Sequence, residues 1–573
     1  MRKRNRIIAL LFAGVMSMSA LMTGCGNDTV QSTEANNAQE SATVKVETES
    51  TTPEDNTLKI ALHSNAFITD YEDNYLTHYF EDKLGIEIEF ELLPATDADA
   101  RTKISLMVAG GEELPDILLY ASLPTETVQQ YGSDGVFLPI QDYLNDPSVM
   151  PNFNNNIPDK DKNKILTAIT MVDGNIYGFP KSEENAWNLT PYRMLINKAW
   201  IDKLGLEMPK TTEDLKNVLI AFRDKDPNGN GLKDEIPLYG MQTGTYGQNI
   251  IAALMNSFTF WDGGSTASNN GLALDESGKN VIAPFTTEEW KQGLLYMKDL
   301  YDEGLMAPGI FTDDDTQFKA TLNSEANIVG IVSSGSNGNW ADYRNNPNFM
   351  GMTLAEPFTG PEGVSYTPYW HYKALNGGFI FADSDKVELA LKFFDLCYDE
   401  LTSITMRYGE EGVNWSADEK DMAGLTNANL AAGIYDKPSI VIFNDYWSEN
   451  NNIHWRNVCP RYASVEFTGS TVSPNNQSKY EWPDNISTLC TMYYQDRHPE
   501  YVLPALKYTE AEAEEILDAV ANIPGFIHQS MAEFITGSRD IEKGWDAYLA
   551  ELENMGLSTW VSTAQVAYER TLK

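Results

Sequence analysis

Apolar and polar positions follow a repeating order along the chain from residue 58 onward. The apolar run at 58–62 predicts a strand, and the run at 86–92, in which apolar and acidic residues alternate, predicts a second, half-exposed strand. A helical pattern lies between them up to Leu84, a second ends at Gly110, and the apolar run at 117–119 precedes a third near 126–131. This order of strand and helix is typical of an α/β fold with a parallel sheet.

The same order continues downstream, with recognisable helix starts. Thr211 predicts the N-terminus of a helix that carries Leu215 and Phe222 on one face. Thr286 and Glu289 predict a capping box ahead of another amphipathic helix. The other elements predicted from the pattern are buried strands at 327–332 and 377–381 and helices at 511–520 and 531–555.

The first 24 residues have the pattern of an export signal rather than of a folded element. Four basic residues precede an apolar stretch at 7–21 that is too short for a permanent membrane helix, and Gly24 and Cys25 close it. Residues 21–25 resemble the bacterial lipobox, in which the cysteine becomes the lipidated mature N-terminus, although Met22 stands where leucine is commonest. We therefore expect a lipoprotein signal peptide at 1–24 and acyl chains, palmitate included, on Cys25. The alternative is an ordinary cleaved signal in which Cys25 is incidental.

The signal predicts that the rest of the chain lies outside the cytoplasm, and composition supports a large folded body on a tether there. Residues 25–56 have almost no large apolar side chain, so they are expected to stay disordered. The 573 residues are 42% hydrophobic, which is enough for two or more lobes. Without residues 1–24, 37 basic residues face 83 acidic ones, a net charge of −46. Such a body repels nucleic acid and anionic lipid, so the N-terminal lipid is the expected membrane contact.

The remaining three cysteines show no metal-binding pattern. Cys397 shares a helical face with Leu391 and Phe394 and is expected to be a core residue. Cys459 and Cys490 form either a disulfide or two buried thiols, and their spacing does not decide between these alternatives. The absence of a CxxC or a His/Cys cluster gives no support for a zinc or iron–sulfur site.

The sharpest chemical motif is the sequence DPNGNGLKDE at 226–235. Oxygen donors stand at its first, third and fifth positions, glycine at the sixth and an acidic residue at the ninth, as in an EF-hand loop. Pro237 occupies the twelfth position in place of the bidentate glutamate, so Glu235 must supply that carboxylate. The expected ligands of a structural calcium ion are Asp226, Asn228, Asn230, the carbonyl of Leu232, Asp234 and Glu235. The alternative is a metal-free Asn-Gly turn.

Six segments in order carry a resemblance to one protein family. They are LMVAGGEELPDI at 106–117, DGNIYGFP at 173–180, INKAWIDKLG at 196–205, residues 226–237, YGEEGVNW at 408–415 and FITG at 534–537. Together they resemble the large extracellular solute-binding lipoproteins of bacterial ABC importers, of the type that takes up oligosaccharides. The resemblance implies an α/β, two-lobed periplasmic-binding-protein-like fold with a ligand cleft between the lobes. The boundaries that we expect are 57–182 and 371–405 for lobe 1, and 183–370 and 406–573 for lobe 2.

Loops beyond the predicted strand ends are the expected ligand site, because open α/β sheets bind ligands there. Aromatic rings pack on the C–H faces of sugars, while carboxylates and amides exchange hydrogen bonds with the hydroxyls. Five loops, at 64–67, 120–123, 183–187, 333–340 and 369–371, contain such side chains. The expected ligand-binding residues are Asn65, Tyr120, Glu183, Asn185, Trp187, Asn339, Trp340, Trp370 and His371.

The function implied is a lipid-anchored substrate-binding protein that delivers an extracellular oligosaccharide to the permease subunits of an ABC transporter, as a monomer and without catalysis. The sequence has no GxSxG, HExxH, P-loop or GxGxxG motif. A secreted glycoside hydrolase built on a carboxylate pair, or a surface receptor or adhesin on the same fold, are the alternative classes. The charge of the sugar stays open, since Arg193, Arg344 or Arg461 can form a local basic pocket.

Overall fold

The computed structural model describes residues 56–110, 113–120, 122–183, 186–242, 246–264, 269–343, 345–370, 374–444, 450–474 and 485–572. These residues belong to one compact unit, Asn56–Lys573. Among them, no helix combines the length and the apolar character that crossing a membrane requires. Cys25, the predicted signal peptide and nearly all of the predicted tether lie outside the described residues.

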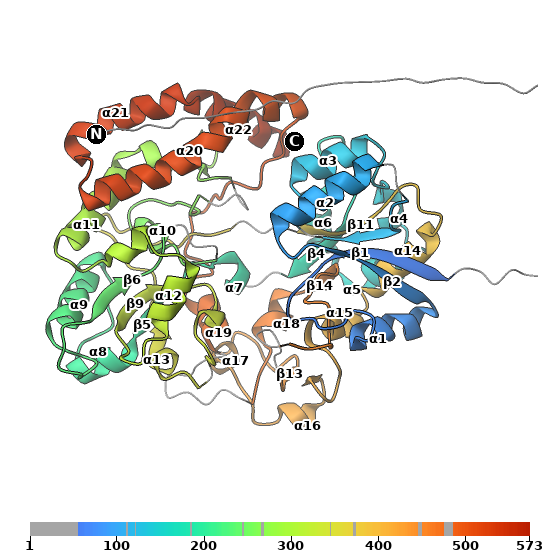
Figure 1. Cartoon of the computed structure of the whole chain (residues 1–573), viewed down its shortest axis with the longest axis horizontal. Coiled ribbons are helices and arrows are strands. Elements are labelled where there is room, and N and C mark those ends of the chain that lie inside the picture. Colours follow the sequence, from blue (N-terminus) through green and yellow to red (C-terminus); the bar gives the residue numbers. More distant parts are fainter. Residues whose placement is uncertain are drawn as a thin grey trace, which may run out of the picture. The chain divides into compact units, whose positions relative to one another are not determined.

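The first of two main sheets has six strands in the order β14-β4-β11-β3-β1-β2 (Figure 1). Strands β1, β2 and β3 are parallel, as the sequence predicts, whereas β11 runs antiparallel to both β3 and β4. The strand bounds are β1 Thr57–His63, β2 Glu87–Leu93, β3 Ile117–Leu119, β4 Phe179–Glu183, β11 Leu375–Ile380 and β14 Arg461–Ala463.

Helices cover both faces of this first sheet. Ile60 and Leu62 of β1 pack with side chains from α1, α5, α6 and α14, whereas Ala61 packs with side chains from α2 and α3. Because side chains alternate across a strand, a strand buried on both faces has consecutive apolar residues, as at 60–62, whereas Lys59 before them is exposed. The helices are α1 Tyr75–Leu84, α2 Asp97–Gly110, α3 Thr125–Ser133, α4 Gln141–Leu144, α5 Pro151–Asn156, α6 Asp159–Ile169, α14 Val387–Leu396 and α15 Glu400–Tyr408.

The second sheet has four strands in the order β10-β5-β9-β6. Its apolar residues share one core with helices that flank it and with the C-terminal helices. The strands are β5 Met194–Asn197, β6 Ile236–Tyr239, β9 Val329–Ser333 and β10 Met352–Leu354. The flanking helices are α7 Ala186–Leu189, α8 Lys198–Leu204, α9 Thr212–Asp224, α10 Ile250–Met255, α11 Glu288–Asp302, α12 Asp315–Leu322, α13 Pro347–Met350 and α19 Asn485–Tyr493.

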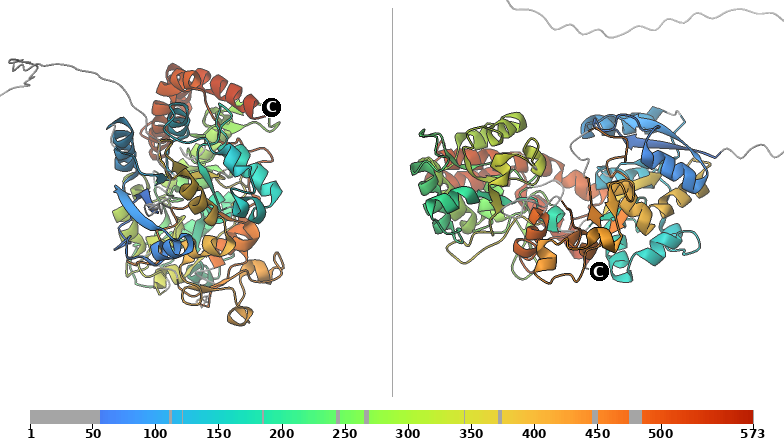
Figure 2. Two further views of the ribbon diagram at one scale, coloured as in Figure 1. Left: turned by 90° about the vertical axis from the view of Figure 1, so that its right-hand side faces the viewer. Right: turned by 90° about the horizontal axis from the view of Figure 1, so that it is seen from below.

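The C-terminal helices differ from the prediction. A single helix, α20 (Glu510–Thr536), replaces the two segments expected at 511–520 and from 531, and α21 (Ile541–Asn554) and α22 (Leu557–Thr571) follow it. Figure 2 shows these three helices, drawn in red, lying together. Apolar positions such as Ile516, Ile523 and Ile527 continue at helical spacing past Pro524, so packing outweighs the hydrogen bond that proline removes.

Two further predictions are corrected by the structure. The cap of α11 is Thr287 rather than Thr286, since the Thr287 side chain accepts a hydrogen bond from the backbone N–H of Trp290. The Thr286 hydroxyl instead donates to the carbonyl of Ala283 in a 3₁₀ turn. Strand β14 pairs with β4 in the first sheet, although the predicted boundary assigns 406–573 to the second lobe. The other lobe boundaries stay a prediction.

The three cysteines within the described residues are all free thiols. Cys397 is fully buried at the end of α14, which confirms it as a core residue. Cys459 belongs to the same core, but Cys490 belongs to the core of the second sheet. Of the two alternatives for Cys459 and Cys490, the structure therefore has the buried thiols.

Smaller elements complete the described chain. They are β7 Ala273–Leu274 paired with β8 Val281–Ile282, β12 Trp415–Ser416 paired with β13 Val441–Ile442, α16 Glu419–Met422, α17 Ala428–Ala431, α18 Val465–Gly469, and the 3₁₀ turns Pro284–Thr286, Pro308–Phe311 and Asn337–Asn339.

Candidate functional site

All six strands of the first sheet have a terminus at one edge, which we call the carboxyl edge, and four of these termini adjoin predicted ligand loops. β1 and β3 are parallel, β11 is antiparallel to β3, and β4 is antiparallel to β11. The ends of β1, β3 and β4 therefore lie at the same edge as the start of β11. Four of the five loops predicted to bind ligand begin or end at these termini, which is the placement expected for the site of an α/β sheet.

Several segments of chain join the first sheet to the second, and we call two of them, which start or end at the carboxyl edge, the crossing segments. Residues 184–193 connect β4 to β5, and residues 355–374 connect β10 to β11. In the second sheet the start of β5 pairs with the end of β9 and lies beside the end of β10. The crossing segments thus bring Trp187, Arg193 and Trp370 to the ends of strands from both sheets.

Arg193 holds the first crossing segment together. Its guanidinium carbon lies 3.3 Å from the centroid of the Trp187 ring and 5.9 Å from that of Tyr246. Its Nη1 donates to the carbonyl of Gly335 at 2.6 Å, and its Nη2 donates to the carbonyl of Trp187. Arg193 is fully buried, while Trp187 is half-buried. A buried cation therefore occupies one face of a partly exposed indole.

Trp370 brings the second crossing segment into the same cluster. Its ring lies edge-on to Tyr192 with the centroids 6.0 Å apart, and 6.2 Å from the ring of Tyr246. Its backbone N–H donates to the carbonyl of Leu189 at 2.8 Å. The indole Nε1 is buried and has no hydrogen-bond partner among the described residues. Buried indole N–H groups usually have a hydrogen-bond partner, so this donor lacks an acceptor that a water or a bound hydroxyl would have to supply.

A buried ion pair lies at the carboxyl edge. Arg461 Nη1 is 3.0 Å from Glu183 Oε1, and Asn457 Nδ2 donates to Glu183 Oε2 at 3.0 Å. Lys181, two residues before Glu183 and on the same strand face, donates to the carbonyl of Asn457. Burial raises the pKa of Glu183, but the positive charges of Arg461 and Lys181 lower it by more than burial raises it. The pKa of Glu183 is therefore below its ordinary value. Glu183 is therefore ionised at neutral pH.

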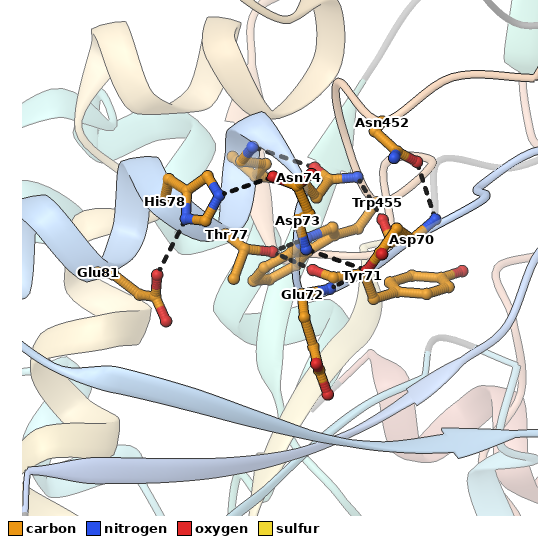
Figure 3. A network of polar contacts seen from close by, with 11 residues as sticks. Asp70, Tyr71, Glu72, Asp73, Asn74, Thr77, His78, Glu81, Asn452 and Trp455 are labelled. Atoms are coloured by element: carbon orange, nitrogen blue, oxygen red, sulfur yellow. Dashed lines mark hydrogen bonds and ion pairs between the residues drawn. The ribbon is translucent and has the colours of Figure 1, made fainter.

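The sequence analysis missed the segment that delivers Arg461 and Asn457 to this edge. Asn452 Oδ1 accepts a hydrogen bond from the backbone N–H of Asp70 at 2.8 Å (Figure 3). It also accepts one from the backbone N–H of Thr69 at 3.1 Å. Trp455 Nε1 donates to Thr77 Oγ1 at 3.0 Å (Figure 3). These bonds tie the segment to the start of α1. Contacts between positions so far apart leave no local pattern, which is why Asn457 was not a candidate.

Two predicted ligand residues of the first sheet have structural roles. Asn65 Oδ1 accepts from the backbone N–H of Phe67 at 3.0 Å, which shapes the loop after β1. The Tyr120 hydroxyl donates to Asp97 Oδ1 at 2.8 Å, and its ring packs edge-on to His63 with the centroids 5.2 Å apart. Tyr120 is 2% exposed. Their contact with a ligand stays a prediction.

The remaining predicted ligand residues are placed as follows. Trp340 is 2% exposed and packs on Phe349 with the ring centroids 4.7 Å apart, inside the core of the second sheet. Asn339 is buried, and its Nδ2 donates to Ser334 Oγ at 2.8 Å. Asn185 and His371 lie outside the described residues. The proposals below do not depend on any of these four.

The loop at 226–235 follows α9 and is folded around Asp226. Asp226 Oδ1 accepts from the backbone N–H groups of Gly229 at 2.8 Å and Asn230 at 3.1 Å, and Oδ2 accepts from Gly231 at 3.0 Å. Gly229 and Gly231 have φ values of +79° and +77°, the left-handed region that favours glycine. The backbone turn that the EF-hand pattern predicts is therefore present.

Carboxylates and amides converge within this loop. The side-chain amides of Asn228 and Asn230 donate to Asp234 at 3.1 and 2.9 Å. Glu235 Oε1 is buried and has no hydrogen-bond partner among the described residues. Burial raises the pKa of Glu235, and the charges of Asp226 and Asp234 raise it further. An orphaned carboxylate oxygen beside two other carboxylates fits a bound divalent cation, which supplies the missing partner.

Carboxylates alone do not complete a metal site here. Across the part of the chain that the structure describes, no group of three or more His, Cys, Asp or Glu side chains is arranged to hold a metal ion. Calcium prefers six to eight oxygen ligands, amide and carbonyl oxygens included. A calcium ion at this loop would therefore also need the amide oxygens of Asn228 and Asn230 and the carbonyl of Leu232, which stay predicted ligands.

The sequence of the chain is similar to a protein family and to individual proteins of known function. The family model described as bacterial extracellular solute-binding protein matches residues 66–400. The chain is 25% identical over 525 residues to the fructooligosaccharide ABC transporter substrate-binding protein FusA of Streptococcus pneumoniae serotype 4, which covers 87% of this chain and 88% of FusA. It is 27% identical over 337 residues to the polygalacturonan/rhamnogalacturonan-binding protein YtcQ of Bacillus subtilis, which covers 58% of this chain and 62% of YtcQ.

Solved structures confirm the fold class. FusA of S. pneumoniae in complex with kestose matches 90% of this chain and 99% of its own, with a TM-score of 0.69 and 22% identity. An extracellular solute-binding protein from Bifidobacterium longum subsp. infantis matches 90% of this chain and 98% of its own, with a TM-score of 0.70 and 22% identity. At these identities the match establishes the two-lobed α/β fold.

Proposed function

The chain belongs to the bacterial extracellular solute-binding proteins, and on this premise we propose that it is the lipid-anchored substrate-binding protein of an ABC importer that captures an extracellular oligosaccharide. The observation that carries the proposal is the group of Trp187, Arg193 and Trp370 in the crossing segments, beside Glu183 at the carboxyl edge.

This group has the chemistry that a sugar requires. The free face of the Trp187 indole suits the C–H face of a pyranose or furanose ring. The unpartnered Nε1 of Trp370 is a donor, and the Glu183 carboxylate is an acceptor for hydroxyl groups. FusA and YtcQ are both named for binding saccharides, which supports the same ligand class here.

The same geometry argues for binding rather than catalysis. Glycoside hydrolysis needs a carboxylic acid with a raised pKa as general acid, beside a second carboxylate. Glu183 has a lowered pKa because Arg461 and Lys181 are next to it, so it accepts hydrogen bonds but does not donate a proton at neutral pH. The protein is therefore proposed to release its sugar unchanged to the permease subunits.

The membrane connection proposed is the lipid on Cys25. Two or more acyl chains hold a protein at a bilayer stably, because each buried CH₂ contributes about 0.8 kcal/mol. The net charge of −46 keeps the folded body from anionic lipid and from other copies of itself, in accord with a monomer on a flexible tether. The permease is the partner that then receives the sugar.

The loop at 226–235 is proposed to hold one structural calcium ion. Asp226, Asn228, Asn230, Asp234, Glu235 and the carbonyl of Leu232 are the ligands. FusA has been solved as an EF-hand mutant in complex with fructo-nystose, so a relative of this chain has such a loop. The ion neutralises three carboxylates and gives Glu235 Oε1 its missing partner, and binding is therefore expected to stabilise the folded state.

The test is calorimetric titration and thermal denaturation of the mature protein with a panel of neutral and acidic oligosaccharides. A ligand present at about 100 times its dissociation constant is expected to add about 2.7 kcal/mol to the free energy of unfolding. Chromatography of the same mixtures is expected to return the sugars intact. Steady release of shorter sugars by the pure protein would show that it is a hydrolase. A lack of binding to every sugar of the panel would contradict the proposal.

A further inference from the structure

Three cations surround one carboxylate at the carboxyl edge. Burial raises the pKa of Glu183, but three positive side chains lower it by more, and these are Arg461, Lys181 and Arg407. Burial and the charge of Arg407 also lower the pKa of Lys181 and that of Arg461, so the cations act on one another as well. Glu183 balances one positive charge, and the group of four therefore has a net charge of +2.

The two cations nearest to Glu183 have donors that no described acceptor uses. Arg461 Nη1 is 3.0 Å from Glu183 Oε1, but neither Nη1 nor Nε makes an aligned hydrogen bond within the described residues, and both are buried. Lys181 Nζ donates to the carbonyl of Asn457, and an ammonium has two more donors. Buried donors usually have acceptors, so this group lacks acceptors that a bound anion would supply.

A strained turn holds an acceptor beside these donors. Arg456 and Asn457 both have a φ of +57°, in the left-handed region that residues other than glycine rarely adopt. Asn457 Nδ2 donates to Glu183 Oε2 at 3.0 Å, while Asn457 Oδ1 is buried and has no hydrogen-bond partner among the described residues. Such conformations persist where the surrounding contacts enforce them, and they are frequent at ligand sites. The Oδ1 atom can accept a hydrogen bond from a hydroxyl.

A bound molecule can reach part of this group. Lys181, Arg407 and Glu183 are half-buried, whereas the side chain of Arg461 is 1% exposed. The net charge of −46 on the mature chain is distributed over all of its residues, and salt screens charges that lie more than about 8 Å apart in water. The adjacent cations therefore outweigh the distant acidic residues at this position.

We propose that Lys181 and Arg407, together with the charge of Arg461, bind the carboxylate of an acidic sugar, so that the captured oligosaccharide contains uronic acid. This inference rests on the proposed function and narrows its ligand class. Hydroxyls of the same sugar donate to Glu183 and to Asn457 Oδ1. Lys181 keeps its charge for this role, since burial lowers its pKa only to about 8.

The experiment measures dissociation constants of the mature protein for pairs of probes that differ mainly in charge. The pairs are trigalacturonate and trimannuronate, each with its fully methyl-esterified form, and the neutral sugars of the panel are measured beside them. In the pair that binds, the acid is expected to bind at least about tenfold more tightly than its ester. Added salt should weaken binding of the acid and leave that of the ester unchanged, because salt screens the attraction between opposite charges.

Two variants should change the ratio of acid to ester affinity in opposite directions. Lys181→Met keeps the length of the side chain and removes its charge, so the ratio should fall towards one. Glu183→Gln removes the carboxylate that repels an acidic ligand, so the ratio should rise. Lys59→Met is the matched control and should keep the ratio, because Lys59 is 47% exposed and pairs with Glu113 near the start of β1, away from the carboxyl edge. A purely structural role for Lys181 would change both affinities alike.

The outcomes separate this inference from the proposed function. An ester that binds as tightly as its acid, or binding of neutral panel sugars alone, overturns the inference and leaves oligosaccharide binding intact. An unchanged ratio in Lys181→Met overturns Lys181 as the residue that binds the acid. If that variant does not fold, the salt dependence of the parent protein decides, since a preference for the acid that salt does not reduce is not electrostatic. If no probe and no panel sugar binds, the proposed function itself fails.

Discussion

The guanidinium carbon of Arg193 lies 3.3 Å from the centre of the Trp187 ring, well inside the roughly 6 Å range of a cation–π contact. The same guanidinium donates to the carbonyls of Trp187 and Gly335. One buried side chain therefore fixes the indole and the loop after β9 together. Arg193 covers one face of the ring, and we expect a sugar to pack on the opposite face.

Replacing Arg193 tests this arrangement. Arg193→Lys keeps the positive charge but removes the planar fork that reaches both carbonyls and stacks on the ring. We expect oligosaccharide affinity, measured by calorimetry, to fall by about ten- to a hundredfold. Arg539→Lys is the control, because Arg539 lies 5.2 Å from the Phe534 ring among the C-terminal helices. Equal effects of the two substitutions would mean that the Arg193 contact is only structural.

Trp187 itself is expected to be the principal platform for the sugar. Trp187→Ala should weaken binding by at least about tenfold with little change in melting temperature, because the side chain is only half-buried. Trp290→Phe should do the reverse, lowering the melting temperature and leaving affinity unchanged, since Trp290 is fully buried under α20. Loss of binding in both variants would show that affinity merely follows stability.

The calcium loop predicts a pH-dependent response to chelator. Without the ion, burial and the charges of Asp226 and Asp234 raise the pKa of Glu235 above its usual 4.5. A raised folded-state pKa gives stability that is present below 4.5 and is lost as the pH rises through the folded value. Chelator should therefore lower the melting temperature more at pH 7 than near pH 4.5, because calcium compensates for the charge of Glu235, which is fully present only at the higher pH.

Substitution identifies the loop as the source of this effect. In the presence of calcium, the Asp226→Ala variant should melt near the temperature at which the parent protein melts in chelator. Adding chelator to the variant should lower its melting temperature little further. Asp82→Ala removes an exposed carboxylate from α1 and should keep the full response to chelator. A chelator response that survives in Asp226→Ala would place the ion elsewhere, and the absence of any response would leave the loop as a turn.

Glu183 predicts a pH dependence of the opposite sign. Its folded-state pKa lies below its usual 4.5, so its stability contribution is present above 4.5 and is lost as the pH falls through the folded value near 2. Glu183→Gln should flatten this acid limb of the stability curve. It should also lower stability at neutral pH by about 3–5 kcal/mol, because Arg461 is left buried without its partner. Denaturant unfolding at several pH values measures both effects.

Lipid attachment at Cys25 is tested in the producing cell. Cys25→Ser should move the protein from the membrane fraction to the soluble extracytoplasmic fraction, because the folded body has no affinity of its own for anionic lipid. Mass spectrometry of the parent protein should find an acylated N-terminal cysteine. Membrane association that persists in the variant, with a mature end elsewhere, would favour the ordinary cleaved signal.

Local patterns were enough to predict most elements of the first sheet. The predicted strand at 58–62 is the centre of β1, and the alternation at 86–92 is β2. Both could be predicted because the spacing of apolar residues along a strand depends on whether one or both of its faces are buried. Thr211 caps α9 as predicted, since a cap needs only the next three residues. The cap of α11 was misplaced by one residue because adjacent threonines satisfy the same pattern.

The carboxyl edge required the topology as well as the pattern. Glu183 and Trp187 were candidates from sequence because they follow a strand and suit a sugar. Arg193 and Arg461 were named only as candidates for a basic pocket, and their pairing with these residues was not predicted. Arg193 is next to the start of β5, and Arg461 begins β14, which the predicted boundary put in the other lobe. Only the pairing of β14 with β4 brings Arg461 to Glu183.

The sequence by itself therefore determined the elements, the calcium loop pattern and the kinds of side chain at the strand ends. These depend on hydrogen bonds and periodicities that span a few residues, so they can be read locally. The tertiary structure decided which of those side chains lie together and which partners each of them contacts. Arg193 against Trp187, and Arg461 with Asn457 against Glu183, are contacts created by chain crossings and strand order, and no local spacing records them.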